Sequence, residues 1–273
     1  MNIDFKESRE SLKSRIKIHD LYGSANLDLW MFEKLKIKSG EKILDLGCGD
    51  GKQCFGLKNY SNKNFSENNI EITGIDEHED LIKIAETKNK KTKSNIKFKL
   101  ASFDKKLLFP DKSFDLVISC FAIYYAENIE KTLLEIKRIL KPGGRIFFTG
   151  PMPNNKKEFN DVIEEAANDK IPKLIGSSRY STEIFGSVKN IFNNAAIEEF
   201  KNQLNFKTIE PFIEYAHSTL EKNRKVYDEF LRNKNLKSLL NEIQNILKKK
   251  IKTYGKLKIT KLVGGISANN TID

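Results

Sequence analysis

The sequence is poor in cysteine and contains no long apolar run. Its 273 residues include only Cys48, Cys54 and Cys120, with no Cys-x-x-Cys spacing. This usage predicts neither a disulfide framework nor a structural zinc site. No apolar stretch reaches the roughly 18 residues that a membrane-spanning helix needs, and residues 1–7 carry no apolar signal core. These absences predict a protein of the reducing cytoplasm, with no metal ion and no membrane partner.

The chain has little arginine despite a formal net charge of +11. Seven of its 48 basic residues are arginine, and the others are lysines scattered among asparagines and isoleucines. Because the planar arginine fork is favoured where a protein contacts phosphates, this composition favours solvated lysines over a nucleic-acid surface. A nucleic-acid partner stays open as the alternative, since high positive charge is also typical of such proteins.

Residues 43–51, with the sequence ILDLGCGDG, are the most informative stretch. The apolar first half predicts a short buried strand, and a helix is predicted from residue 52. Between them, Gly47, Gly49 and Gly51 permit positive φ and let a ligand lie against the main chain. The turn would present free N–H groups at a helix N-terminus. Strand, glycine turn and helix are together typical of nucleotide sites in doubly wound α/β folds.

The glycine spacing departs from the dinucleotide pattern Gly-x-Gly-x-x-Gly, and two carboxylates, Asp45 and Asp50, accompany the turn. A carboxylate suits a ligand ammonium group better than a pyrophosphate. The stretch resembles motif I of the class I S-adenosylmethionine-dependent methyltransferases. This resemblance implies S-adenosyl-L-methionine as the cofactor, with Asp45, Gly47, Cys48 and Gly49 at its amino-acid tail.

A second acid follows the next predicted strand. Residues 70–76 alternate in the manner of a strand and end at Asp76, the position at which a carboxylate holds a ribose diol. Glu77 is the neighbouring candidate for the same role. The alternative is that Asp76 is the N-cap of the helix that includes Leu81.

The adenine contacts are predicted after the third strand, residues 96–100. The family often has an acid there that accepts from the adenine amino group, but Asp104 is displaced by about one position. Ser102 and Phe103 are therefore the residues predicted to flank the ring, with Asp104 turned to solvent as an alternative.

Residues 115–120 form a continuous apolar run that predicts a fully buried strand. Ligands in such folds lie beyond the carboxyl ends of the strands, so Cys120 and the aromatic run 121–125 are expected at the site. Related small-molecule methyltransferases often place an N-terminal helix and an aromatic over the cofactor, which implies Tyr22. Packing of Tyr22 and Trp30 on the sheet is the alternative.

Methyl transfer requires mainly that acceptor, methyl group and sulfur are aligned, so a conspicuous catalytic set is not expected, and the catalytic residues stay unassigned. Candidates for acceptor contact are Tyr124, Tyr125, Tyr180 and His217. Tyr180 lies in a predicted loop that could cap the site. His217 could serve as a general base near neutral pH. Structural packing is the alternative for both.

The fold class predicted is α/β: a Rossmann-like doubly wound sheet of seven strands, mostly parallel with an antiparallel final strand, plus a helical elaboration. Residues 114–150 also resemble the methyltransferase family, above all LEIKRILKPGG at 134–144. A helix is expected over 128–140, with Asn128 as its N-cap. A surface loop is expected over 59–69.

One domain is predicted for residues 1–273. It comprises an N-terminal helical segment (1–40), a cofactor-binding core (41–150), a helical acceptor-side elaboration with a sixth strand (151–255), and a last strand with the tail (256–273). Helices are expected at 155–169, 182–194 and 221–252, and the strand 256–263 is expected to break at Gly264 and Gly265.

Three functions stay open at this point. The first is methyl transfer to a small-molecule acceptor, which the helical elaboration after the predicted fifth strand, residues 145–150, favours. The second is methylation of RNA, such as tRNA, which only the charge favours. Against DNA enzymes, strand four ends in Ser-Cys-Phe-Ala rather than the Asn/Asp-Pro-Pro-Tyr of amino-methylating enzymes. The third is a protein that binds S-adenosylmethionine without turnover.

Overall fold

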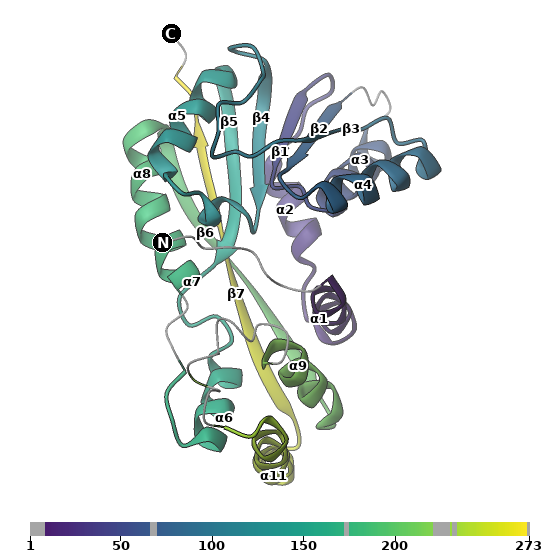
Figure 1. The fold of residues 1–273 in the computed structure, drawn as a ribbon, viewed down its shortest axis with the longest axis vertical. Helices are drawn as coiled ribbons and strands as arrows, with labels where there is room; N and C mark the ends of the chain where they lie inside the picture. The colour runs from purple at the N-terminus through teal and green to yellow at the C-terminus, as the bar shows by residue number, and fades with distance from the viewer. Residues whose placement is uncertain (1–8, 66–69, 172–174, 221–229, 231–233, 272–273) are drawn as a thin grey trace.

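A computed structural model describes residues 9–65, 70–171, 175–220, 230 and 234–271. It contains a seven-stranded sheet of order β3-β2-β1-β4-β5-β7-β6 (Figure 1). β7 is antiparallel to β5 and β6, and the other pairs are parallel. The predicted α/β fold with an antiparallel final strand is confirmed. The strands are β1 (Lys42–Leu46), β2 (Glu71–Asp76), β3 (Lys97–Leu100), β4 (Phe114–Cys120), β5 (Leu140–Pro151), β6 (Asn193–Phe206) and β7 (Leu257–Asn269).

Helices cover both faces of the parallel part of the sheet (Figure 1). The α-helices are α1 (Arg9–Tyr22), α2 (Leu27–Leu35), α3 (Lys52–Asn64), α4 (Glu79–Thr92), α5 (Ile129–Ile139), α6 (Lys157–Ala167), α7 (Ile175–Arg179), α8 (Phe185–Ile191), α9 (Glu210–Leu220) and α11 (Leu236–Tyr254), with the short turns η1 (Ile123–Tyr125) and η2 (Tyr180–Ile184). α5 and α8 bury one face around Val117 and Phe148. α2, α3 and α4 bury the other around Leu116 and Phe147. Within the described residues, no helix combines the length and the apolar character that a bilayer crossing needs.

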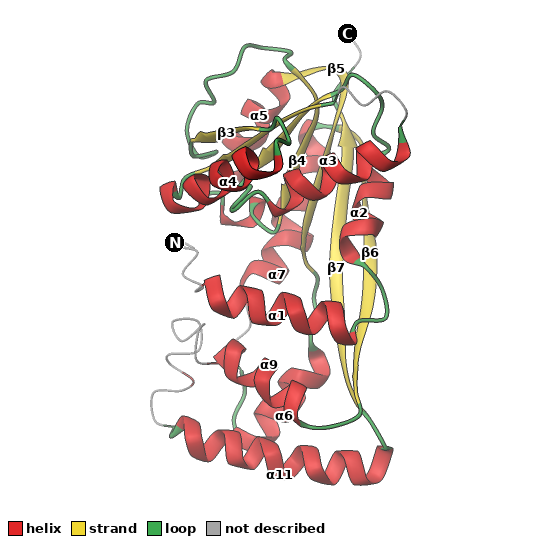
Figure 2. Cartoon of the chain, turned by 90° about the vertical axis from the view of Figure 1, so that its right-hand side faces the viewer, coloured by secondary structure: helices red, strands yellow, loops and turns green. Residues whose placement is uncertain are grey.

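A second hydrophobic core lies beyond the end of β5. β5 pairs with β7 only as far as Val263, whereas β6 and β7 continue as a two-stranded extension to Phe206 and Leu257. α1, α6, α9 and α11 gather on this extension (Figure 2) and bury apolar side chains such as Leu204 and Ile259. A two-stranded ribbon alone is marginal in water, so the four helices supply the apolar surface that it needs.

Gly264 and Gly265 do not break the last strand, which runs through both to Asn269. A Cβ on Gly264 would lie 2.8 Å from Cε1 of Tyr180, and one on Gly265 would lie 2.7 Å from Cη2 of Trp30. The prediction of a strand end here is therefore wrong. These glycines allow aromatic rings to approach the two faces of the strand closely.

Several helix bounds also differ from the predictions. α3 continues to Asn64, so the first part of the loop predicted over 59–69 is helical, and residues 66–69 lie outside the described residues. The helix predicted over 182–194 corresponds to α7, η2 and α8 in succession, starting at Ile175 and ending at Ile191. From Leu236 on, the helix predicted over 221–252 is observed as α11, and α9 precedes the predicted span without having been predicted. Part of that predicted span, 221–229 and 231–233, lies outside the described residues.

The helix predicted over 128–140 is confirmed as α5. The side chain of Asn128 accepts a hydrogen bond from Lys131 N at 3.0 Å, which makes Asn128 the N-cap, as predicted. The apolar face of α5, with Leu133 and Ile136, is buried in the core of the sheet. α5 thereby fixes the position of the segment between β4 and Asn128, which borders the candidate site.

Candidate functional site

The turn between β1 and α3 is held by hydrogen bonds from its own backbone. Gly47 N and Cys48 N both donate to Ile75 O, each at 2.9 Å. Gly49 N donates to Asp76 Oδ2 at 2.8 Å. The prediction that the turn presents free N–H groups is therefore wrong for these three residues, because the end of β2 accepts from them. The turn and Asp76 form one hydrogen-bonded unit.

Two glycines of the turn have different surroundings. Gly47 and Gly49 adopt φ values of +71° and +55°, in the left-handed region that glycine tolerates best. A Cβ on Gly47 would lie 2.4 Å from Cβ of Ala122, so the turn packs tightly against the segment after β4. A Cβ on Gly49 would meet nothing within 4 Å. The open side of the turn, at Gly49, is where a ligand can contact the backbone.

Asp45 lies at the carboxyl end of β1 and is only 1% exposed. Its Oδ2 accepts a hydrogen bond from the Cys54 thiol at 3.3 Å, whereas Oδ1 has no hydrogen-bond partner among the described residues. Burial raises the pKa of Asp45 to about 7; the bond from Cys54 opposes the rise and the charge of Asp76 adds to it. A ligand ammonium group would give Oδ1 a donor and would favour the ionised carboxylate.

Asp76 ends β2 and is 8% exposed. Besides Gly49 N, it accepts from His78 N at 2.9 Å and contacts His78 Nδ1 at 2.9 Å, both through Oδ1. The N-cap of α4 is His78, so the alternative assignment of Asp76 as N-cap is wrong. A carboxylate offers about four acceptor positions, which leaves Oδ2 able to accept from a further donor. Glu77, the next residue, is exposed.

The segment after β3 forms another side of the site. The ring of Phe103 borders the turn, since its Cε1 would lie 3.4 Å from a Cβ on Gly47. Ser102 Oγ accepts from Asp104 N at 3.4 Å. Asp104 in turn accepts from Glu127 N at 2.8 Å through Oδ1, so its carboxylate is bonded to the segment before α5. Phe103 therefore lies beside the turn, whereas the carboxylate of Asp104 bonds to the backbone of Glu127.

The exit from β4 carries backbone strain. Phe121 has φ +56° although it is not glycine, which costs about 1–2 kcal/mol. Its N–H donates to Thr149 O at 3.0 Å. The preceding residue, Cys120, is half-buried, and its Sγ lies 3.2 Å from Sδ of Met31 on α2. Strained residues of this kind gather at functional sites, and this one places Ala122 over Gly47.

Tyr124 and Tyr125 follow in η1, with ring centroids 4.6 Å apart. Tyr124 is 9% exposed and meets the ring of Tyr180 edge-on at 6.4 Å. Tyr125 is half-buried. Both lie just beyond the end of β4, so their candidacy for acceptor contact stays a prediction.

Tyr180 does not lie in a capping loop. It begins η2 and is fully buried. Its hydroxyl lies 2.8 Å from Phe148 O and 3.0 Å from Gly264 O, and it accepts from Ile266 N at 3.2 Å. The predicted role at the acceptor is therefore wrong, because the hydroxyl joins β5 to β7 inside the core.

Two further candidates, Tyr22 and His217, lie on helices that pack on the extension of β6 and β7. The ring of Tyr22 packs against Phe206 at 5.1 Å, with the sheet extension, in line with the packing alternative for this residue. His217 is on the exposed face of α9, which Figures 1 and 2 both place away from the end of β1. The structure brings neither residue to the glycine turn.

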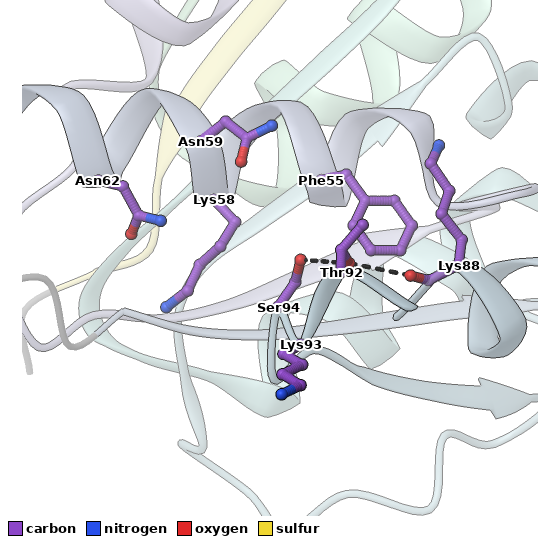
Figure 3. A pocket seen from close by; sticks show the side chains of 8 residues that line it. All are labelled: Phe55, Lys58, Asn59, Asn62, Lys88, Thr92, Lys93 and Ser94. Atoms are coloured by element: carbon purple, nitrogen blue, oxygen red, sulfur yellow. Dashed lines mark hydrogen bonds between the residues drawn. The ribbon is translucent and has the colours of Figure 1, made fainter. Parts of the chain in front are cut away.

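Two surface cavities lie apart from the glycine turn. One, of about 260 Å³, lies between α3 and the end of α4, and Figure 3 shows the side chains that line it. Lys88 and Lys93 border it, and Lys88 Nζ lies 4.6 Å from the ring centroid of Phe55. Cations at a helix C-terminus complement the helix dipole, which accounts for Lys93, the C-cap of α4. A second cavity, of about 510 Å³, adjoins Arg145 in β5. Neither cavity is lined by a predicted site residue.

Two residues at the site were not predicted. Cys54 lies in the first turn of α3, is buried, and donates to Asp45; its place three residues after Gly51 was the sequence signal available. Arg179, at the end of α7, donates to the carbonyls of Tyr124 and Ala126. No local pattern identifies Arg179, because its partners lie more than 50 residues earlier.

Known proteins resemble this chain in both sequence and fold. The profile of a family described as "Methyltransferase domain" matches residues 37–208, more than half of the chain. The demethylmenaquinone methyltransferase of Tropheryma whipplei (strain Twist) is 31% identical over 156 residues, which cover 54% of this chain and 61% of that protein. The chain thus spans about three fifths of the length of this curated relative.

Two solved structures have a similar fold. A putative methyltransferase from Bacillus halodurans C-125 has a TM-score of 0.56 at 15% identity, with 90% of this chain and 100% of that one covered. Phosphoethanolamine N-methyltransferase 2 of Haemonchus contortus, solved in complex with S-adenosyl-L-methionine, has a TM-score of 0.53 at 16% identity, with 97% and 57% covered.

Proposed function

Because the chain belongs to the class I S-adenosylmethionine-dependent methyltransferases, whose cofactor is S-adenosylmethionine, we propose that it transfers a methyl group to a small-molecule acceptor. The observation that carries the proposal is the buried Asp45 Oδ1, which has no hydrogen-bond partner in the described part of the chain, next to a glycine turn that is open at Gly49. This combination suits a ligand that presents an ammonium group close to a backbone.

Each part of the cofactor has a proposed partner in the chain. Asp45 accepts from the ammonium group of the tail, and the turn from Gly47 to Gly49 lets the tail lie close to the backbone. Asp76 accepts from the ribose hydroxyls, with Glu77 as the neighbouring acid. Ser102 and Phe103 flank the adenine.

The chemistry divides between cofactor and protein. When bound, S-adenosylmethionine supplies a methyl group that its positive sulfur already activates. The protein binds and orients the reactants, which is the main requirement of a direct displacement. Tyr124 and Tyr125 are the proposed acceptor contacts, because they adjoin the turn through Ala122 and the end of β4.

The acceptor class is proposed from similar proteins, and the cellular compartment from the composition. Two of the methyltransferases named above have names that specify demethylmenaquinone and phosphoethanolamine, both small molecules. We propose one methyltransferase domain, in which residues 151–255 form the acceptor side. Its three free cysteines suit the cytoplasm.

The test is a screen for methylated products. The purified chain is incubated with methyl-labelled S-adenosylmethionine and either a metabolite extract or total RNA, and label is located by mass spectrometry. The proposal predicts label on a small molecule in the extract, absent with Asp76→Ala. Label on RNA alone would show that the acceptor is RNA and not a small molecule. Cofactor binding without any labelled product would contradict enzymatic activity and favour a binding protein.

A further inference from the structure

Arg179 connects the C-terminal half of the chain to the segment that follows β4. Its Nη1 donates to Tyr124 O and its Nη2 to Ala126 O, both at 2.7 Å. The side chain is only 11% exposed. Charge-assisted bonds of this kind are among the stronger hydrogen bonds in proteins. The guanidinium therefore fixes the backbone on both sides of Tyr125.

The segment that Arg179 holds is the one that packs on the glycine turn. Ala122 approaches Gly47 so closely that a Cβ there would be 2.4 Å away. The segment leaves β4 through Phe121, whose φ of +56° is unfavourable for a residue with a side chain. A strained backbone persists only where the surroundings fix it. Two carbonyls held by one buried guanidinium provide such a constraint.

Arg179 is itself held in place from both ends. The next residue, Tyr180, is fixed between β5 and β7 by the three hydrogen-bond contacts of its hydroxyl. The carboxylate of Glu183 accepts from Arg179 Nε at 3.1 Å and from Nη2 at 3.2 Å. A continuous series of contacts thus leads from the sheet through Tyr180 and Arg179 to Ala122 and Gly47.

We propose that Arg179 is a positioning residue that sets cofactor affinity by holding residues 121–126 against the glycine turn. This inference rests on the proposed function, since it assigns Arg179 a role at the same cofactor site. Without the guanidinium, the strained exit from β4 relaxes and Ala122 no longer supports the turn in its ligand-binding form. Arg179 acts through the backbone that it bonds and not through contact with the cofactor.

The test compares variants by calorimetric titration with S-adenosylhomocysteine. Arg179→Met keeps the length of the side chain and removes the donors, and we expect its Kd to be about tenfold weaker, the equivalent of one lost hydrogen bond to a charged group. Arg179→Lys keeps a cationic donor but not the planar fork, so we expect its Kd to be about threefold weaker than that of the wild type, between the wild type and Arg179→Met. Such an intermediate affinity is expected if the bonds to the two carbonyls position the segment.

Arg145→Met is the matched control. Arg145 also donates to a backbone carbonyl, Leu35 O at 2.8 Å, and pairs with the acid Glu41 at 2.7 Å, but it does so in β5 beside Leu116 of β4, away from the turn. We expect Arg145→Met to lower the melting temperature and leave the Kd unchanged.

The outcomes separate the two proposals. A wild-type protein that does not bind S-adenosylhomocysteine contradicts the proposed function itself. A wild type that binds, with Arg179→Met binding equally well, overturns the role of Arg179. Weakening by Arg145→Met as large as that by Arg179→Met overturns it too, because affinity would then follow stability. Should Arg179→Met fail to fold, Arg179→Lys decides: wild-type affinity contradicts the inference, and affinity about threefold weaker supports it.

Discussion

The carboxyl ends of β1 and β2 and the extension of β6 and β7 bury very different groups. At the first, two carboxylates, Asp45 and Asp76, are buried, and the charge of Asp76 contributes to the raised pKa of Asp45. At the second, the core consists of side chains such as Phe159, Phe206 and Ile243. Among the described residues, each buried carboxylate is in the N-terminal half of the chain, and the third, Glu41, is paired with Arg145.

This difference separates binding from stability. A buried carboxylate oxygen without a donor is unfavourable to folding, and perturbed acids of this kind are typical of functional sites. Apolar burial, by contrast, is the main favourable contribution to folding. Substitutions in the second core should therefore change stability without affecting cofactor binding, and substitutions at the turn should do the reverse.

The largest effect is expected in the second core. Phe159→Ala removes a fully buried ring that packs on Phe212 and Tyr215. We expect the free energy of unfolding to fall by about 4 kcal/mol, measured by chemical denaturation, with the Kd for S-adenosylhomocysteine within twofold of the wild type. If Phe159→Ala also raised the Kd in proportion to the loss of stability, the two regions would not be energetically independent.

The next effect concerns Asp76. Asp76→Ala removes the acceptor that bonds Gly49 N and that we assign to the ribose, so cofactor affinity should weaken about 100-fold. Calorimetry measures it. Asp80→Ala is the control, because it removes the same charge from an exposed position on α4. Unchanged affinity in Asp76→Ala would end the ribose assignment.

Tyr180→Phe tests whether the Tyr180 hydroxyl stabilises the core and does not act at the acceptor site. The substitution leaves Ile266 N without its acceptor and two carbonyls without the hydroxyl, so we expect a loss of about 2 kcal/mol in the free energy of unfolding. The turnover number should stay within about twofold of the wild-type value, because the Tyr180 hydroxyl takes no part in the reaction. A large fall in turnover at unchanged stability would return Tyr180 to the acceptor site.

The smallest effect is a dependence on pH. The pKa of Asp45 is raised from its ordinary 3.8 to about 7, so about one tenth of Asp45 is ionised at pH 6 and about half at pH 7. A ligand ammonium binds the ionised form, and it stays largely protonated in this range. Cofactor binding should thus be roughly fivefold tighter at pH 7 than at pH 6.

The control for the pH effect is Asp45→Asn, which cannot ionise. It should bind the cofactor more weakly and with the same Kd at both pH values. Equal affinities in the wild type at pH 6 and pH 7 would show that Asp45 does not bind the ammonium group.

Local patterns of the sequence correctly predicted β1, the glycine turn and the acid that ends β2. The run 43–51 and the acid at Asp76 depend on residues within one strand and one turn, where alternation and glycine spacing are informative. The same reasoning could not reveal that Ile75 and Asp76 accept from the turn, because that depends on how β2 pairs with β1.

The C-terminal half was predicted less well for a similar reason. Two adjacent glycines, Gly264 and Gly265, predict the end of a strand. The strand continues because the rings of Tyr180 and Trp30 pack closely on these two positions. The environment of Tyr180 is set by β5 and β7, which are remote in sequence. Contacts between distant elements override local propensity at these positions.

We propose that S-adenosylmethionine lies on the open side of the glycine turn, between Asp45 and Asp76. A crystal structure of the protein with S-adenosylhomocysteine tests it most directly. We predict the ammonium group within hydrogen-bond distance of Asp45, the ribose hydroxyls on Asp76 and the adenine beside Phe103. A ligand bound in the cavity between α3 and α4, or one that contacts neither carboxylate, would contradict the claim.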